Sequence, residues 1–166
     1  YLYDEITYKI IKKATETAMA RIDAAPAAST SEAVGVPVAT FTGTNPTTAD
    51  IINAKALLKG DLNDVVVVCS RETEAAVKVE ALGAGFAYDP FDGSEVLHYD
   101  FPQTTTTKMV IGDLAGILAN LPEGDAVKFI FDELSLAEED LVKIVGRMMA
   151  SIEVVEPGAF VKVQPA

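Results

Sequence analysis

The chain has 166 residues, of which 49% are apolar, so it can bury the core of one ordinary domain or of two small lobes that share elements. Its formal net charge of -12 argues against nucleic-acid binding, because that affinity rests on neutralising phosphates and the thirteen basic residues are scattered. The apolar runs are far shorter than the roughly 20 residues of a membrane span, and no stretch has the layout of a signal peptide. We therefore expect a folded protein of cytoplasmic origin that makes no membrane contact.

The first element in chain order is a long amphipathic helix. Apolar residues recur at steps of four from Asp4 to Ile22, and charged residues occupy the other positions of the helical wheel. The stretch from Ala24 to Ala39 then breaks this pattern with Pro26, Gly35 and Pro37. We expect a connection over Ala24 to Ala39, where a boundary between two lobes could lie.

A second helix and a strand follow. The segment from Thr48 to Leu58 has an apolar side, Thr47 or Thr48 is placed to cap it, and Gly60 ends it. The segment from Val65 to Cys69 is uniformly apolar and mostly β-branched. This composition predicts a strand buried on both faces.

The passage from this strand into a third helix, Glu72 to Leu82, tests for a phosphate site. A dinucleotide or P-loop site needs glycines between strand and helix, so that backbone N–H groups close on the phosphate. Residues 70–73 contain no glycine, whereas Gly83 and Gly85 come after the helix and are placed to end it. The sequence therefore predicts no nucleotide cofactor.

Turns and short strands make up the rest of the chain. Asp89-Pro90 and Asp92-Gly93 form turns before a strand over Glu95 to Tyr99, and Thr104 to Thr107 is predicted to be a loop. The segment KMVIGDLAGILA, residues 108–119, is predicted to be a strand that breaks at Gly112.

The segment from Leu141 to Glu153 fits both a helix of period 3.6 and a half-buried strand. Gly146 and the β-branched residues after Ser151 favour a strand. Pro157-Gly158 then makes a turn before a final strand, AFVKV. The order of elements indicates an α/β or α+β mixture without internal repeats.

Few residues could carry catalysis or bind a metal. His98 is the only histidine, so a hydrolase would have to pair it with Ser70, Ser94 or Cys69. A lone histidine on a strand is more often structural, and Cys69 after a valine run is predicted to be a buried apolar side chain. One histidine and one cysteine cannot form a usual zinc site.

Two acidic groups are the remaining candidates: Asp89, Asp92 and Glu95 in one turn, and Glu138, Glu139 and Asp140 in another. The first group could bind calcium weakly, but it lacks the spacing of an EF-hand loop. We interpret both groups as turns whose carboxylates are exposed to solvent. The run DELSLAEED, residues 132–140, is likewise predicted to be a solvent-exposed face rather than a docking strip. We therefore predict no catalytic, cofactor or metal site.

Several motifs, in their order, resemble the C-terminal two-thirds of the Hong Kong 97-like major capsid proteins of tailed bacteriophages and prophages. They are the strand-helix unit DVVVVCSRETEAAVKVEAL, a turn at Asp100 to Pro102, an I-G-D step at Ile111 to Asp113, and Arg147 on a late strand. The last motif comprises Pro157, Ala159, Phe160 and Val161. The helix from Asp4 to Ile22 is similar to the family's spine helix.

The resemblance implies an α+β fold of two lobes. An axial lobe, residues 44–137, would hold a mixed sheet with flanking helices. A peripheral lobe, residues 1–43 and 138–166, would hold the spine helix and the returning strands. The resemblance also implies that the segment after Leu141 is strand.

The same resemblance implies a non-enzymatic structural subunit of an icosahedral shell. Its partners would be copies of itself in pentamers and hexamers, together with scaffold and portal proteins, and its location would be the virion head, assembled in the bacterial cytoplasm. An encapsulin-like compartment is the sibling alternative, and a small hydrolase using His98 with Ser70 or Cys69 is the alternative from another class. The N-terminal arm and extended loop of the family are not among these residues, so we expect the chain alone to assemble poorly, and no crosslinking lysine can be assigned.

Overall fold

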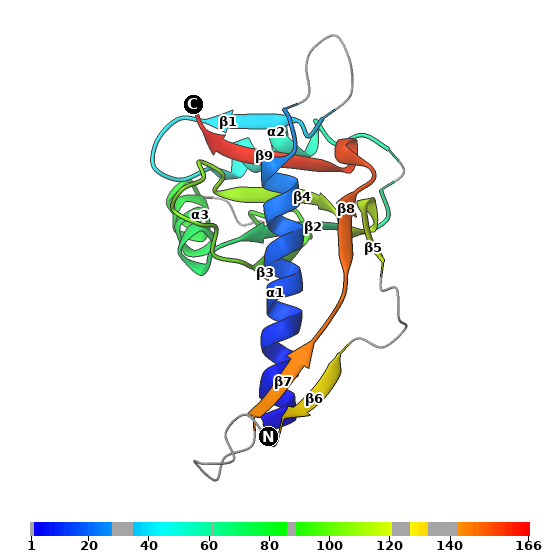
Figure 1. Ribbon diagram of the computed structural model, residues 1–166. Coiled ribbons are helices and arrows are strands. Elements are labelled where there is room, and N and C mark those ends of the chain that lie inside the picture. The colour runs from blue at the N-terminus through cyan, green and yellow to red at the C-terminus, as the bar shows by residue number, and fades with distance from the viewer. Residues whose placement is uncertain (1, 28–34, 61, 86–88, 121–126, 133–142) are drawn as a thin grey trace. The chain divides into compact units, whose positions relative to one another are not determined.

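The computed structural model describes residues 2–27, 35–60, 62–85, 89–120, 127–132 and 143–166 (Figure 1). The chain forms two compact units. The first comprises Tyr1–Arg21 and Ile117–Glu153, and the second comprises Ile22–Gly116 and Val154–Ala166. The lobes predicted from the sequence have other bounds, at residues 43/44 and 137/138, and they stay a prediction. Among the described helices, none combines the length and the apolar character that a membrane crossing requires.

The first unit is built on the N-terminal part of helix α1, Leu2–Ala24, which confirms the predicted long helix. Strands β6, Lys128–Asp132, and β7, Lys143–Arg147, form an antiparallel two-stranded ribbon. Strands β5, Ile117–Asn120, and β8, Ser151–Val154, form a second two-stranded sheet. The late segment is therefore strand in the part that the structure describes, as predicted, whereas β6 was not predicted.

The ribbon packs against α1 through small and aromatic side chains. The rings of Tyr3 and Phe129 meet edge to face with centroids 5.0 Å apart. A Cβ atom on Gly146 would lie 2.4 Å from Ile6 and 2.9 Å from Ile10. The absence of a side chain at Gly146 therefore allows β7 to approach the helix, and this close packing favours the strand over the alternative helix.

The second unit contains a mixed five-stranded sheet with the order β1-β9-β4-β2-β3. Its strands are β1, Val38–Phe41; β2, Val65–Cys69; β3, Glu95–His98; β4, Met109–Asp113; and β9, Phe160–Pro165. β1 runs parallel to β9 and β2 parallel to β3, whereas β4 runs antiparallel to both of its neighbours. The buried core cluster draws on all these strands except β3 and on two helices, α2, Thr48–Lys55, and α3, Arg71–Gly83.

The valine-rich strand lies inside this sheet, as predicted. β2 has hydrogen-bonded neighbours on both edges, and Val67 and Cys69 are fully buried. β-branched side chains suit such a position because their restricted rotamers pack well on a pleated surface.

Both helices of this unit start at side-chain caps. α2, Thr48–Lys55, begins with a capping box between Thr47 and Asp50. α3, Arg71–Gly83, begins at Ser70, whose hydroxyl oxygen accepts from the Thr73 N–H. The predicted helices are confirmed, although α2 ends three residues before the predicted Leu58. Beyond α3, Gly85 has φ +75°, a conformation that favours glycine at a helix end.

Two sequence predictions need correction. β1 begins inside the segment predicted to be a connection. It forms because parallel pairing with β9 supplies hydrogen bonds, and its short sequence alone does not predict this pairing. The predicted strand does not break at Gly112: β4 runs through it, and the break is the 3-10 turn Leu114–Gly116. Glycine at position 112 marks a close approach between strands rather than a strand end.

Candidate functional site

The catalytic candidates come together at the carboxyl ends of β2 and β3, where Cys69 lies across from His98 in the strand register. Burial raises the pKa of the Cys69 thiol to about 11, and the nearby Glu74 carboxylate adds to the effect. Cys69 is therefore a protonated thiol near neutral pH, and a thiol is a poor nucleophile. Its burial confirms the predicted apolar role.

The other members of the predicted dyads have structural partners. The Nε2 atom of His98 lies 2.6 Å from a carboxylate oxygen of Glu74, and the Ser70 hydroxyl holds the first turn of α3. Hydrogen bonds from His98 and from Lys78 lower the pKa of Glu74. This arrangement joins α3 to the edge strand β3 but does not place a general base on a nucleophile. Ser94 precedes β3, at the end of the strand opposite to His98.

The acidic turn before β3 uses its carboxylates to hold its own backbone. Asp89 accepts from the N–H groups of Phe91 and Gly93 at 3.1 and 3.0 Å. The Lys55 ammonium donates to the Phe91 carbonyl at 2.6 Å and lies 3.5 Å from the Asp92 carboxylate. In the described part of the chain, no three acidic, histidine or cysteine residues are grouped to hold a metal ion. The second acidic group, residues 138–140, lies outside the described residues, as does the 132–140 run except Asp132.

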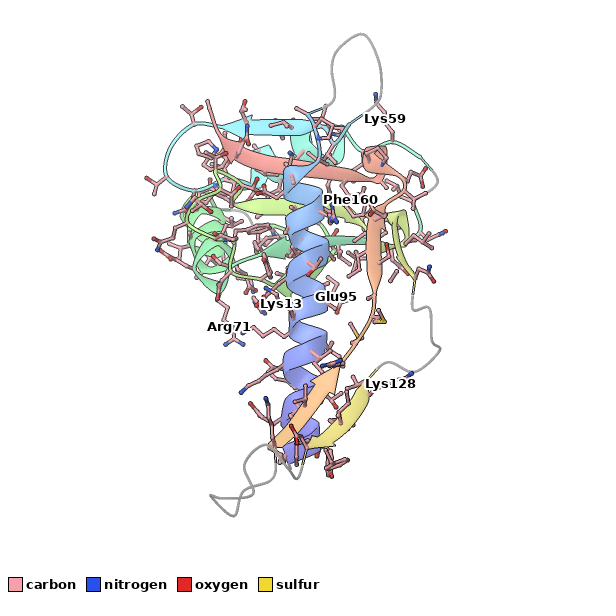
Figure 2. All side chains as sticks on the ribbon, in the orientation of Figure 1. Lys13, Lys59, Arg71, Glu95, Lys128 and Phe160 are labelled. Carbon is pink, nitrogen blue, oxygen red and sulfur yellow. The ribbon has the colours of Figure 1, made fainter. Side chains whose placement is uncertain are left out.

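Two of the motifs that carried the family resemblance are direct neighbours in the second unit. The I-G-D step forms the end of β4, and the segment from Pro157 to Val161 leads into β9. These strands pair antiparallel, with Ile111 across from Val161 and Gly112 across from Phe160. Figure 2 labels Phe160, which is fully buried in this unit.

Two glycines make this contact possible. A Cβ atom on Gly112 would lie 2.4 Å from the carbonyl oxygen of Ala159 and 2.6 Å from the Phe160 ring. A Cβ atom on Gly116 would lie 2.8 Å from the same ring. The I-G-D step is therefore a packing motif whose glycine lets two strands lie in close contact.

The aspartate of the I-G-D step ties three segments together. Asp113 is only 6% exposed, and its carboxylate accepts from the N–H groups of Ala115 at 2.8 Å and Asn63 at 2.9 Å, with Asp64 at 3.5 Å. The hydrogen bonds from Ala115 and then Asn63 lower the pKa of this carboxyl. Asp113 thus fixes both the turn after β4 and the entry into β2.

A second polar cluster, missed by sequence reasoning, fixes the end of α1. The buried Lys162 ammonium donates to the carbonyls of Asp23 and Ala25 at 2.9 and 2.8 Å, and burial lowers its pKa. The Asp23 carboxylate accepts from the hydroxyls of Thr105 and Thr107. In the sequence Lys162 alternates with apolar residues of β9, which was the available sign of a strand. The helix end that its ammonium contacts is 139 residues away, so the sequence does not indicate this contact.

The remaining resemblance positions behave differently. The Asp100 to Pro102 turn has no regular structure, and the Phe101 ring packs edge to face on Tyr99 with centroids 5.0 Å apart. Arg147 is exposed on β7, which belongs to the first unit. The arrangement as a whole offers tight strand packing and fixed turns, and in the described residues the polar groups detailed above are engaged in holding the fold.

Solved structures of two other proteins share this arrangement. A chain in the cryo-EM structure of the holo-SrpI encapsulin complex from Synechococcus elongatus PCC 7942 matches with a TM-score of 0.58 and 15% identity, over 76% of this chain and 52% of that one. A chain in the structure of Gordonia phage Cozz matches with a TM-score of 0.50 and 15% identity, over 96% of this chain and 63% of that one.

The chain has the Hong Kong 97-like fold. It spans about half to two-thirds of the length of these two structures. No protein-family model matches the sequence. The search of curated proteins gives no match. The α+β fold class implied by the sequence resemblance is confirmed, with the mixed sheet and flanking helices of the Hong Kong 97-like fold in the second unit.

Proposed function

We propose that the chain is a structural subunit of a closed shell, the major head protein of a tailed phage or prophage. The observation that carries this proposal is the match to the Gordonia phage Cozz chain, which extends over 96% of the residues. The subunit would assemble with copies of itself into pentamers and hexamers. It would do so without catalysis, in the bacterial cytoplasm, as part of the virion head, with scaffold and portal proteins as further partners.

The physical character of the second unit supports this role. Asp113 and Lys162 are polar groups that fix turns and a helix end. The close contact of β4 with β9 packs the centre of the sheet tightly. A wall needs subunits that keep their shape when neighbours press on them, because packed interiors transmit strain.

Two shell types are candidates for this fold. The encapsulin complex matches with the higher TM-score, which supports a cargo compartment, whereas the phage chain matches over more of the residues. We favour the phage shell because the match extends over almost the whole chain.

Negative-stain microscopy of the complete gene product tests the proposal. We expect closed particles of uniform diameter. Monomers at high protein concentration would contradict the proposal. Nucleic acid recovered from nuclease-treated particles favours the phage shell, whereas a single co-purifying protein cargo favours the compartment.

A further inference from the structure

The two faces of the β6–β7 ribbon differ in character. Tyr3 contacts Phe129 and Phe131, and Gly146 faces Ile6 and Ile10, so these ribbon positions form the face on α1. Alternate residues of a strand point to the opposite face. The outer face therefore carries Lys128, Ile130 and Asp132 from β6, and Lys143, Val145 and Arg147 from β7.

The outer ribbon face, as we call these six residues, has an apolar centre with charged ends. Ile130 lies across from Val145, and its side chain is 42% exposed. Lys128 lies directly across from Arg147 at one end, and Asp132 across from Lys143 at the other. Figure 2 labels Lys128 on β6. This face thus has three basic residues and one acidic residue, although the whole chain has a net charge of -12.

The charges of this face suit an acidic partner surface. Lys128 and Arg147, which lie across from each other, are both basic, and complementary charges across an interface favour and orient association.

The second unit presents an acidic surface of that kind. A cleft of about 720 Å³ there is lined by Asp64, Asp92 and Glu95, together with the apolar side chains Leu58 and Leu62. Lys55, its basic residue, bonds to the Phe91 carbonyl and lies beside Asp92. Asp64 and Glu95 are exposed. The cleft therefore combines carboxylates with an apolar patch, as a complement to the outer ribbon face.

We propose that the outer ribbon face of one copy binds the acidic cleft of a second copy, with Lys128 and Arg147 near Asp64 and Glu95. This inference rests on the proposed self-assembly and names one of its interfaces. In the proposed contact each copy offers its ribbon to one neighbour and its cleft to another, which makes the contact head-to-tail. A head-to-tail contact generates rings or shells when its rotation closes.

Charge exchange tests the proposal in this 166-residue chain, in which a single pairwise contact is measurable even where closed shells form poorly. The ribbon variant carries Lys128→Glu and Arg147→Glu, and the cleft variant carries Asp64→Lys and Glu95→Lys. Sedimentation velocity over a range of concentrations measures self-association. We expect each variant alone to associate about tenfold or more weakly than the original chain, because like charges meet at the contact. A mixture of the two variants should regain the association, since each supplies the charge that the other needs.

A matched control carries Lys9→Glu and Lys12→Glu, two reversals on the exposed side of α1, and should associate no more weakly than the original chain. Circular dichroism and urea unfolding verify that each variant is folded. Association of the original chain should weaken in about 1 M salt, where the Debye length falls to about 3 Å.

Three outcomes would overturn the inference. They are association of the ribbon variant equal to that of the original chain, a mixture that does not recover, and a ribbon variant that loses only binding to a short DNA duplex. The last outcome would make the ribbon a nucleic-acid face. These results are distinct from failure of the proposed function, because closed particles are scored by microscopy on the complete gene product, whereas pairwise association is scored here on soluble chains.

Discussion

Gly112 shows how one residue determines the spacing of two strands. Its missing side chain leaves room for the Ala159 carbonyl and the Phe160 ring, both of which belong to the segment paired with β4. The obstacle nearest to a new Cβ atom is backbone, which cannot rotate away as a flexible side chain can. The fold therefore tolerates a larger residue at position 112 poorly.

We expect Gly112→Ala to lower the free energy of unfolding by about 1–3 kcal/mol, because an extra methyl group overpacks the contact. Urea unfolding measures the change. Gly83→Ala is the matched control, since a Cβ atom at position 83 meets open space and alanine favours a helix. Equal stability of the two variants would contradict the packing role assigned to the I-G-D step.

Asp113 makes stability depend on acid pH. Its folded-state pKa lies below the ordinary value, so the carboxylate stabilises the fold at pH values above that ordinary value. This contribution is lost as the pH falls through the lowered folded pKa. We expect Asp113→Asn to be less stable than the original chain at pH 7, and the difference to shrink steadily below about pH 4. Urea unfolding at several pH values measures this difference, and a constant gap from pH 7 to pH 3 would refute the assignment.

At the scale of single elements, α3 depends on its cap. Ser70 satisfies an N–H group in the first turn that has no partner within the helix. The same residue was one of the three nucleophiles considered from the sequence. A capping role and a nucleophilic role for Ser70 therefore predict different results when this residue is replaced.

We expect Ser70→Ala to lower the free energy of unfolding by about 1 kcal/mol, the usual cost of a lost N-cap. Hydrolysis of an activated ester should be the same before and after the change. His98→Ala is the parallel variant and should likewise leave the ester rate unchanged. A rate that falls in both variants would restore the hydrolase hypothesis.

At the scale of the whole molecule, the two compact units differ in how they bury their strands. In the second unit a five-stranded sheet packs with α2 and α3 around a buried cluster. In the first unit the described strands form two-stranded sheets, and an isolated pair of strands is marginal without further packing. Stability should consequently be uneven along the chain.

Native-state hydrogen exchange tests this difference. We expect the amides of β2 and β4 to exchange most slowly, because they open only with the whole sheet, and those of β6 and β7 to exchange faster through local opening. Shell assembly should slow exchange in the ribbon if the outer ribbon face is an interface. Equal protection of the ribbon and the sheet in the unassembled chain would contradict the first expectation.

Local sequence patterns determined the elements that depend on few neighbours. The steps of four from Asp4 to Ile22 predicted α1, and the valine run predicted β2, because period and side-chain shape act within one segment. The expectation that no phosphate loop lies between β2 and α3 rests on the lack of glycine in residues 70–73 and stays a prediction. Cys69 was correctly predicted to be a buried apolar residue.

Tertiary structure decided what depends on distant partners. β1 forms where β9 supplies hydrogen bonds, and β4 continues through Gly112 because Phe160 packs there. Lys162 reaches a helix end 139 residues away, and Lys128 lies across from Arg147 only because β6 and β7 pair. A sequence does not give the distances in space between such residues, and the free energy of a contact depends on those distances. The sequence by itself therefore determined the helices and the central strand, and the fold determined which residues act together.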